Sequence, residues 1–422
     1  MASKAWTALW IALALSLVVR AGVRDRGVIS DHLEFGRRVL AGSPLYAPFE
    51  DPGQPLHAPY PPGFGVLTAP LSLLSERLAR IGWALLQVGA LWAIGRWLAQ
   101  GHAATSPPLR SGTRSPGVGL QPLLLITALI TSRYVLRDAH GGGGNLINLA
   151  CALTGVALAS RRATLSASVL LGLSLATKPT HALLLPLLCA FGRGRVAVGA
   201  AAAAAAWTGL ALLALRQGWQ PLAHWAEGTW RYATQPDLFA PPSHGFPPFS
   251  WMNQCLRCAV ARWCGIVPTA WTDQVAWMAP GLGLAPADTA PIARAFSLAL
   301  LGVTALVVVR RRHAPTAALS LIAAVCSLSL LLSPVSWKAH HVALIPAVFL
   351  LVSQAAAGRR GLWWPLLIYT AVCLPGAEFT GKAYKEILQS HYAFTAGTLL
   401  LWGLCLREAL RAGSAPQPNE TG

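Results

Sequence analysis

Residues 316–332 read TAALSLIAAVCSLSLLL and contain no charged side chain. A run of about 17 such residues is long enough to cross the hydrocarbon core of a bilayer as an α-helix. The whole chain has the same character, since 54% of its 422 residues are hydrophobic and 11% are charged, with a mean hydropathy of +0.50. Soluble domains carry about 25% charged residues. The sequence therefore predicts an all-α polytopic membrane protein, and it makes a soluble enzyme, a disordered scaffold or a nucleic-acid-binding domain a poor fit.

Similar apolar runs recur on both sides of this stretch. Twelve predicted cores lie at 5–20, 81–98, 120–136, 145–160, 164–177, 180–191, 196–215, 292–309, 316–332, 342–357, 362–375 and 393–409. The short cores 164–177 and 180–191 are separated by Pro179, so they can also form one kinked helix. We therefore expect about twelve transmembrane helices, within a range of ten to thirteen.

The net charge of +18 is explained by basic residues placed between the apolar runs. Cytoplasmic loops of membrane proteins carry an excess of Lys and Arg. With twelve spans and a cytoplasmic N-terminus, the basic loops and the tail all fall inside, at 110–114, 161–162, 193–195, 310–312, 359–360 and 407–411. This arrangement predicts cytoplasmic termini and requires that segment 63–75 does not cross. Pro61 and Pro62 before it and Glu76 after it favour a helix lying in the membrane interface.

The domain organisation predicted from this pattern is a single transmembrane domain over residues 1–422. Two long segments remain on the outer face, 21–80 with the interfacial helix and 216–291. The first apolar segment is followed by Arg20 and Arg24 and lacks a convincing cleavage site, so we interpret it as a retained helix rather than a signal peptide.

Polar residues from distant loops collect on the outer face of this topology. Ionisable groups near membrane depth are costly and usually functional. The group includes Asp31, His57, Tyr60, Asn145, Lys178, Asn253, Trp337, Lys338, His340 and His341. It indicates a site at the membrane–water boundary that handles a lipid-linked substrate.

Simpler interpretations exist for several of these residues. Asp31 and Glu34 have the spacing of an N-cap and its N3 partner, so they can simply start a helix at 31–41. The glycine run 141–144 can be a flexible linker. Asn145 and Asn148 lie on one helical face and can be interhelical hydrogen-bond partners.

Three of the eight cysteines share the outer loop. Cys255, Cys258 and Cys264 resemble a metal site, but no fourth ligand follows at a typical spacing. A disulfide on an oxidising face would leave one thiol over. The other five lie in apolar segments and act as small hydrophobic residues. With only Asp31 and Glu34 as a paired acid candidate outside, we expect no metal or other cofactor.

Four ordered stretches resemble glycosyltransferase family 87, whose members are polytopic enzymes of the GT-C superfamily. The family includes mycobacterial mannosyltransferases that use polyprenyl-phosphate-mannose. The stretches are Asp31-x3-Phe35 leading to Ala41-Gly42-Ser43-Pro44-Leu45-Tyr46; Tyr60-Pro61-Pro62-Gly63 followed by Ala69-Pro70-Leu71 and Trp83; Gly144-Asn145-Leu146-Ile147-Asn148 then Gly172 to Lys178-Pro179-Thr180; and residues 332–341, LSPVSWKAHH. The chain departs from the family at Phe35, where Tyr is common, and at Asn145, which follows four glycines where the family more often has Gln-x-Asn.

The resemblance implies a transfer of sugar, most simply mannose, from a polyprenyl phosphate to a glycolipid or polysaccharide with inversion. It implies that Asp31 is the general base that takes the proton of the acceptor hydroxyl. Cations should meet the charge that develops on the leaving phosphate. The donor-binding candidates are Lys178, Lys338, His340 and His341 for the phosphate, and Tyr60, Trp337 and Asn253 for the sugar, with Asn145 as a further residue for phosphate or sugar.

Other functions remain open on the sequence alone. An arabinofuranosyl transferase has the same architecture. A transporter or lipid flippase needs coupling charges at mid-membrane, yet almost no acid lies inside the apolar cores, Asp138 being at a helix end. A catalytically inactive scaffold is a further alternative. The composition, rich in Ala, Arg and Trp, suggests a bacterial plasma membrane with the active site facing outward.

Overall fold

The predicted all-helical architecture is confirmed. The computed structural model describes residues 2–23, 27–46, 60–105, 118–235, 237–239, 249–275 and 277–412. The only β-type pairing among these residues is an isolated bridge between Gly265 and Leu284. The α-helices are α1 (Ala2–Val23), α2 (Ile29–Ala41), α3 (Gly63–Ser72), α4 (Glu76–Thr105), α5 (Leu120–Gly141), α6 (Asn145–Ser160), α7 (Thr164–Thr177), α8 (Leu184–Ala190), α9 (Gly194–Leu215), α10 (Gln220–Thr234), α11 (Leu256–Cys264), α12 (Thr269–Thr272), α13 (Pro286–Arg311), α14 (Ala318–Leu332), α15 (Ile345–Ala356), α16 (Trp363–Cys373), α17 (Ala377–Ser390) and α18 (Ala393–Arg411).

Each of the twelve predicted apolar cores overlaps a helix, although 180–191 and 362–375 include turn or coil residues, and the count of twelve spans is not confirmed. By length and composition, seven of the described helices can cross a membrane on their own. Two pairs, α5 with α6 and α7 with α8, qualify only together and are bent by 115° and 117°. The structure therefore has seven to nine candidate spans. The orientation of the termini stays a prediction, and the basic loop 110–114 lies outside the described residues.

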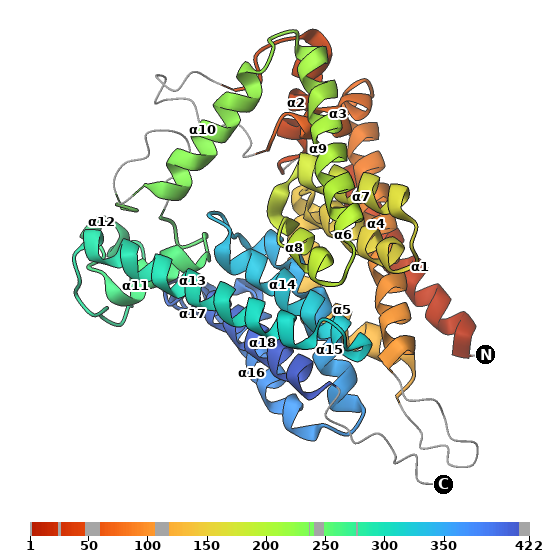
Figure 1. Cartoon of the computed structure of the whole chain (residues 1–422). Coiled ribbons are helices and arrows are strands. Elements are labelled where there is room, and N and C mark those ends of the chain that lie inside the picture. The colour runs from red at the N-terminus through yellow and green to blue at the C-terminus, as the bar shows by residue number, and fades with distance from the viewer. Residues whose placement is uncertain are drawn as a thin grey trace.

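Helices α14 and α15 form the centre of the molecule. Every residue of α14 from Leu319 to Leu331 is buried, and α14 packs against α15 and α18 (Figure 1). Helix α1 lies at the periphery and exposes Ile11, Leu15 and Val19. Because lipid tails are as apolar as these side chains, an apolar outer surface of this kind fits a helix that faces the bilayer.

The two segments predicted to lie outside the membrane are also helical. Segment 21–80 contains α2 and α3, and α3 matches the predicted helix at 63–75, although its placement in the interface is not tested. Segment 216–291 contains α10, α11 and α12, and Figure 1 shows α10 running obliquely away from the end of α9. Helix α2 packs on both α3 and α9, and the Val28 backbone N–H just before α2 donates to the Gly141 carbonyl at 2.8 Å, which places the start of α2 beside the end of α5.

Candidate active site

Helix α2 presents Asp31 on an exposed surface. The helix begins at Ile29 after the N-cap Val28, which makes no side-chain cap. The interpretation that Asp31 and Glu34 cap a helix starting at residue 31 is therefore wrong. Glu34 instead pairs with two arginines one turn later, at 3.2 and 3.0 Å. The exposed Asp31 carboxylate makes no hydrogen bond or ion pair with any residue that the structure describes, so it can accept a proton from a substrate.

A buried aromatic cluster fixes Tyr60 next to α2. His32 Nε2 lies 3.3 Å from the Tyr60 hydroxyl. The Tyr60 ring stacks on Phe64 of α3 with centroids 4.1 Å apart. The Tyr46 hydroxyl donates to the Tyr60 carbonyl at 2.8 Å. Because contacts from three segments converge on it, Tyr60 has a fixed orientation. His57, predicted on the same face, lies outside the described residues.

The charges around Tyr60 come from several helices. The pKa of the Tyr60 hydroxyl is raised by burial and then by the negative charges of Asp138 and Asp31. The pKa of His32 is lowered to about 3 by burial and by the positive charge of Lys178. Charges act strongly only over short distances in this setting. The contacts agree with this, because the Val28 backbone N–H before α2 donates to the Gly141 carbonyl at the end of α5 at 2.8 Å, and Lys178 after α7 lies over the Tyr60 ring.

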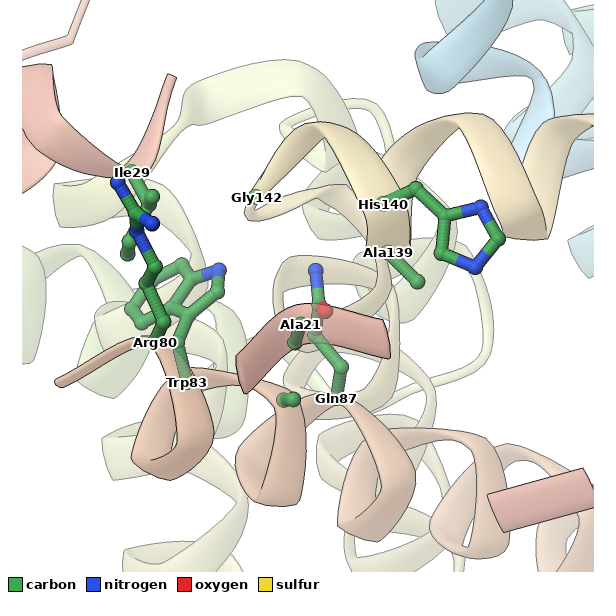
Figure 2. A pocket seen from close by; sticks show the side chains of 9 residues that line it. Ala21, Ile29, Arg80, Trp83, Gln87, Ala139, His140 and Gly142 are labelled. Carbon is green, nitrogen blue, oxygen red and sulfur yellow. The ribbon is translucent and has the colours of Figure 1, made fainter. Parts of the chain in front are cut away.

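The glycine run forms an ordered turn between α5 and α6 rather than a flexible linker. Gly142 has a φ of +71°, which favours glycine. A Cβ on Gly143 would lie 2.0 Å from Asp138 Oδ1, so no larger residue fits. Trp83 and Gln87 donate side-chain N–H groups to the Gly143 carbonyl at 3.1 and 2.5 Å. Figure 2 shows both side chains on α4, in the recess beside Gly142.

This turn brings Asp138 against the first residues of α6. Asp138 is fully buried. Its Oδ1 accepts the Asn145 side-chain amide at 2.6 Å, and its Oδ2 accepts the Leu146 backbone N–H at 2.9 Å. The Asn145 carbonyl oxygen then accepts Lys178 Nζ at 2.7 Å. The amide of Asn145 thus bridges an acid and an ammonium.

Lys178 projects from a break in the helix. Its backbone is extended, at φ −164° and ψ 105°. The ring of Pro179 clashes with a helical conformation of the residue before it and so favours this extended one. Asn148 donates its side-chain amide to the carbonyls of Ser174 and Lys178, at 2.7 and 3.0 Å. The interpretation of Asn148 as an interhelical hydrogen-bond partner is confirmed. Nζ of Lys178 lies 5.4 Å from the centre of the Tyr60 ring.

His340 completes the group from the segment that follows α14. Its Nε2 lies 2.7 Å from Lys178 Nζ, and its Nδ1 lies 3.1 Å from the Val335 carbonyl. An ammonium can only donate, so Nε2 faces the charged lysine with its lone pair, while Nδ1 lies 3.1 Å from both the Val335 carbonyl and the Trp337 backbone N–H. In this arrangement His340 is neutral. Asn145, Lys178 and His340, predicted from three distant loops, therefore meet through direct contacts.

His340 and His341 belong to a short 3-10 helix, Lys338–Leu344, and His341 lies on its other side. Its Nδ1 lies 3.0 Å from the Trp337 carbonyl, and its buried ring packs 5.3 Å from Tyr134. The Trp337 ring is parallel to that of His340 with centroids 6.3 Å apart. The two adjacent histidines thus have different surroundings, and only His340 contacts Lys178 among the bonds described.

Asn253 and Lys338 hold the segment in place. Asn253 donates to the Pro334 carbonyl and accepts the Ser336 backbone N–H, both at 2.9 Å. Lys338 donates to Gln389 at 3.0 Å. Since both ends of the Asn253 amide are used on the backbone of 334–336, we interpret Asn253 as a support of this segment rather than as an open sugar contact.

Asp138 is the residue at this site that the sequence did not single out as a candidate. Its only indication was its position, an acid at the end of an apolar helix just before the glycine run.

Among the described residues, no group of three His, Cys, Asp or Glu side chains is arranged to hold a metal ion. Cys255 accepts the Cys258 backbone N–H at 3.4 Å, and both side chains are buried and form no disulfide with a described cysteine. The independence of the reaction from metal stays a prediction.

Comparison with known proteins gives one match. The model of the family described as glycosyltransferase family 87 matches residues 58–334. This range includes Tyr60, Asn145, Lys178 and Asn253, whereas Asp31 lies before it and residues 337–341 lie after it. Comparisons with curated proteins and with solved structures give no match.

Proposed function

This chain belongs to glycosyltransferase family 87 and is a membrane glycosyltransferase, and on that basis we propose that it transfers mannose from a polyprenyl-phosphate donor to a glycolipid or polysaccharide acceptor. The observation that supports this proposal most strongly is the Lys178 ammonium held between Asn145 and His340, 5.4 Å from the Tyr60 ring. Helix α2 carries the exposed Asp31 directly before His32, whose ring contacts Tyr60 at 3.3 Å.

The proposed chemistry is a single displacement. The acceptor hydroxyl gives its proton to the Asp31 carboxylate while its oxygen attacks the anomeric carbon. The bond from this carbon to the phosphate oxygen breaks, and its electron pair leaves with the polyprenyl phosphate. Attack from the face opposite the leaving group inverts the configuration. The exposed position of Asp31 supports this role, because a base must reach a substrate that arrives from outside the protein.

We assign the leaving phosphate to Lys178. Two of its three N–H groups are used, on Asn145 and His340, and the third is available for a phosphate oxygen. In this proposal Lys178 carries the positive charge and His340 accepts one of its N–H groups. A charge-assisted hydrogen bond to a developing phosphate charge is stronger than a neutral one and lowers the barrier when it is preorganised.

The neighbouring rings suit the sugar, since pockets that hold small molecules combine aromatic faces with a few polar groups. We place the sugar between Tyr60 and Trp337, whose ring lies parallel to that of His340. Lys338, His341 and Asn253 support the segment 334–341 in this proposal. The polyprenyl tail lies in the surrounding bilayer.

We propose that the site faces the outside of a bacterial plasma membrane. Helix α15 separates His340 at one end from Arg359 at the other. At that second end, Arg359, Arg407 and Arg411 surround the buried Glu408. An arginine-rich end is typical of the cytoplasmic side, so the opposite end, with Lys178 and His340, is placed outside.

The experiment that tests this function uses the purified chain in proteoliposomes with a set of radiolabelled donors. Polyprenyl-phosphate-mannose, polyprenyl-phosphate-arabinofuranose and GDP-mannose are each supplied with a lipid extract as acceptor. We expect label in the lipid fraction from polyprenyl-phosphate-mannose and none above empty liposomes from GDP-mannose. Transfer from arabinofuranose alone would change the sugar, and transfer from the nucleotide sugar alone would contradict the proposed donor class.

A further inference from the structure

The buried carboxylate of Asp138 has contacts that no step of the proposed chemistry uses. It is fully buried at the end of α5, and its oxygens accept the Asn145 side chain at 2.6 Å, the Leu146 backbone N–H at 2.9 Å and the Asn145 backbone N–H at 3.4 Å. With these bonds it is closed to substrate. Any effect of Asp138 on the reaction must therefore pass through another residue.

The Asn145 amide is that connection. An amide has one end that only donates and one end that only accepts. The Asp138 carboxylate accepts, so it fixes the NH2 end toward itself, and the carbonyl end is then directed at Lys178 Nζ, 2.7 Å away. On the other side of Lys178, His340 is held by the Val335 carbonyl. Lys178 is thus fixed between two acceptors that are each fixed in turn.

Charge gives Asp138 a second effect on Lys178. An ammonium removed from water is costly unless a counter-charge compensates it. Among the residues described around this group, Asp138 is the buried acid, and its charge is felt at Tyr60, over whose ring the ammonium lies. The carboxylate therefore favours an ordered, charged Lys178 in the absence of substrate.

We infer that Asp138 is a positioning residue for the donor phosphate, which acts through Asn145 to hold the Lys178 ammonium where the leaving phosphate binds. The inference rests on the proposed function, and it adds a residue whose role is the orientation and charge of Lys178. The same carboxylate also caps the first turn of α6, so the test must separate positioning from folding.

The variant Asp138→Asn keeps the size of the side chain and one oxygen acceptor but removes the charge. Asn145→Ala breaks the bridge to Lys178 and leaves Asp138 able to accept the Leu146 N–H. The control Thr131→Val removes a buried hydroxyl two turns earlier on α5, whose bond is to the Thr127 carbonyl, and touches none of the bridge. Thermal unfolding in detergent shows which variants are folded.

The readouts are the KM for polyprenyl-phosphate-mannose, the kcat, and the Kd for undecaprenyl monophosphate, which needs no turnover. For Asp138→Asn and for Asn145→Ala we expect KM and Kd to rise about tenfold to a hundredfold, with a smaller change in kcat. Thr131→Val should keep the wild-type KM and Kd. If Asp138→Asn does not fold, Asn145→Ala still tests the bridge, because a folded Asn145→Ala variant with wild-type KM and Kd would overturn the inference that Asp138 acts through Asn145.

A double-mutant cycle with Lys178→Met decides whether the effect passes through the lysine. In the Lys178→Met background we expect Asp138→Asn to change Kd by less than about twofold. Equal effects of Asp138→Asn in both backgrounds, or a folded Asp138→Asn variant with wild-type Kd and KM, would overturn the inference alone. A wild-type protein that neither binds undecaprenyl monophosphate nor transfers sugar would overturn the proposed function, and the inference with it.

Discussion

The close contact between α2 and α3 gives a prediction about the position of Asp31. Gly36 lies on α2 five residues after Asp31, and a Cβ added to it would lie 2.8 Å from the backbone carbon and oxygen of Thr68 and 2.9 Å from the Ala69 nitrogen. Backbone atoms cannot turn aside as a flexible side chain does. For Gly36→Ala, reaching an ordinary contact of 3.4 Å requires α2 to move by about 0.6 Å, since packed interiors leave no free space.

The size of the effect follows from this shift. Overpacking of this kind costs about 1–3 kcal/mol of stability. A misplacement on the order of 1 Å costs about a hundredfold in rate, so we expect kcat/KM for sugar transfer to fall by about tenfold or more in Gly36→Ala. The matched control is Gly89→Ala on α4, where an added Cβ meets nothing within 4 Å. That control should gain about 0.5–1 kcal/mol from helix propensity and keep its kcat/KM.

The assay measures donor-dependent transfer and thermal unfolding for both variants under identical conditions. A Gly36→Ala protein with wild-type kcat/KM would show that the position of α2 does not control the reaction, and the assignment of its carboxylate as the base would lose its structural support.

Three further predictions follow from the site. Lys178→Met removes a charge-assisted hydrogen bond to the phosphate that is worth about 1.5–3 kcal/mol. In steady-state transfer assays kcat/KM should therefore fall about tenfold to a hundredfold. A change in kcat/KM of less than twofold would contradict the assignment of Lys178 to the phosphate. His32, with its pKa lowered to about 3, stays neutral in the fold while the unfolded chain takes up a proton near pH 6.5. The free energy of unfolding should therefore fall by about 1.4 kcal/mol per pH unit from about pH 6 down to 3. Measured by thermal unfolding, the dependence of Tm on pH over this range should be weaker in His32→Gln than in the wild type. An equal dependence in both proteins would count against the burial of a neutral ring. Asn253→Ala should lose about 2 kcal/mol of folding stability, measured by thermal unfolding, because it removes both bonds to the 334–336 backbone. The control Met252→Ala, at an exposed position, should have close to wild-type stability. Similar losses of stability in both variants would refute the supporting role of Asn253.

The helices were predictable because their cause is local. An uncharged apolar run satisfies its own backbone groups only as a helix in lipid, and each predicted core overlaps a helix. The number of crossings was not predictable in the same way. It depends on the bends of 115° and 117° at the glycine run and at Pro179, and a breaking residue marks where a helix stops without fixing the direction of the next one.

The site was predictable in part for a similar reason. Lys178, Asn145 and His340 stood out because polar groups at the ends of apolar runs must find partners. Which partners they find depends on tertiary packing. A 3-10 helix has about three residues per turn, so the adjacent His341 points to Tyr134 while His340 points to Lys178. Asp138 could be recognised only once its contact with Asn145 was visible.

The measurement that tests the central claim most directly is sugar transfer by Asp31→Asn beside Glu34→Gln. Both variants remove one exposed carboxylate from α2 with no change of size, and Glu34 pairs with arginines while Asp31 has no partner among the described residues. With polyprenyl-phosphate-mannose as donor, we predict that Asp31→Asn loses transfer by at least about a hundredfold and still binds undecaprenyl monophosphate, while Glu34→Gln remains within about twofold of wild type. Retained turnover in Asp31→Asn would contradict the assignment of the base.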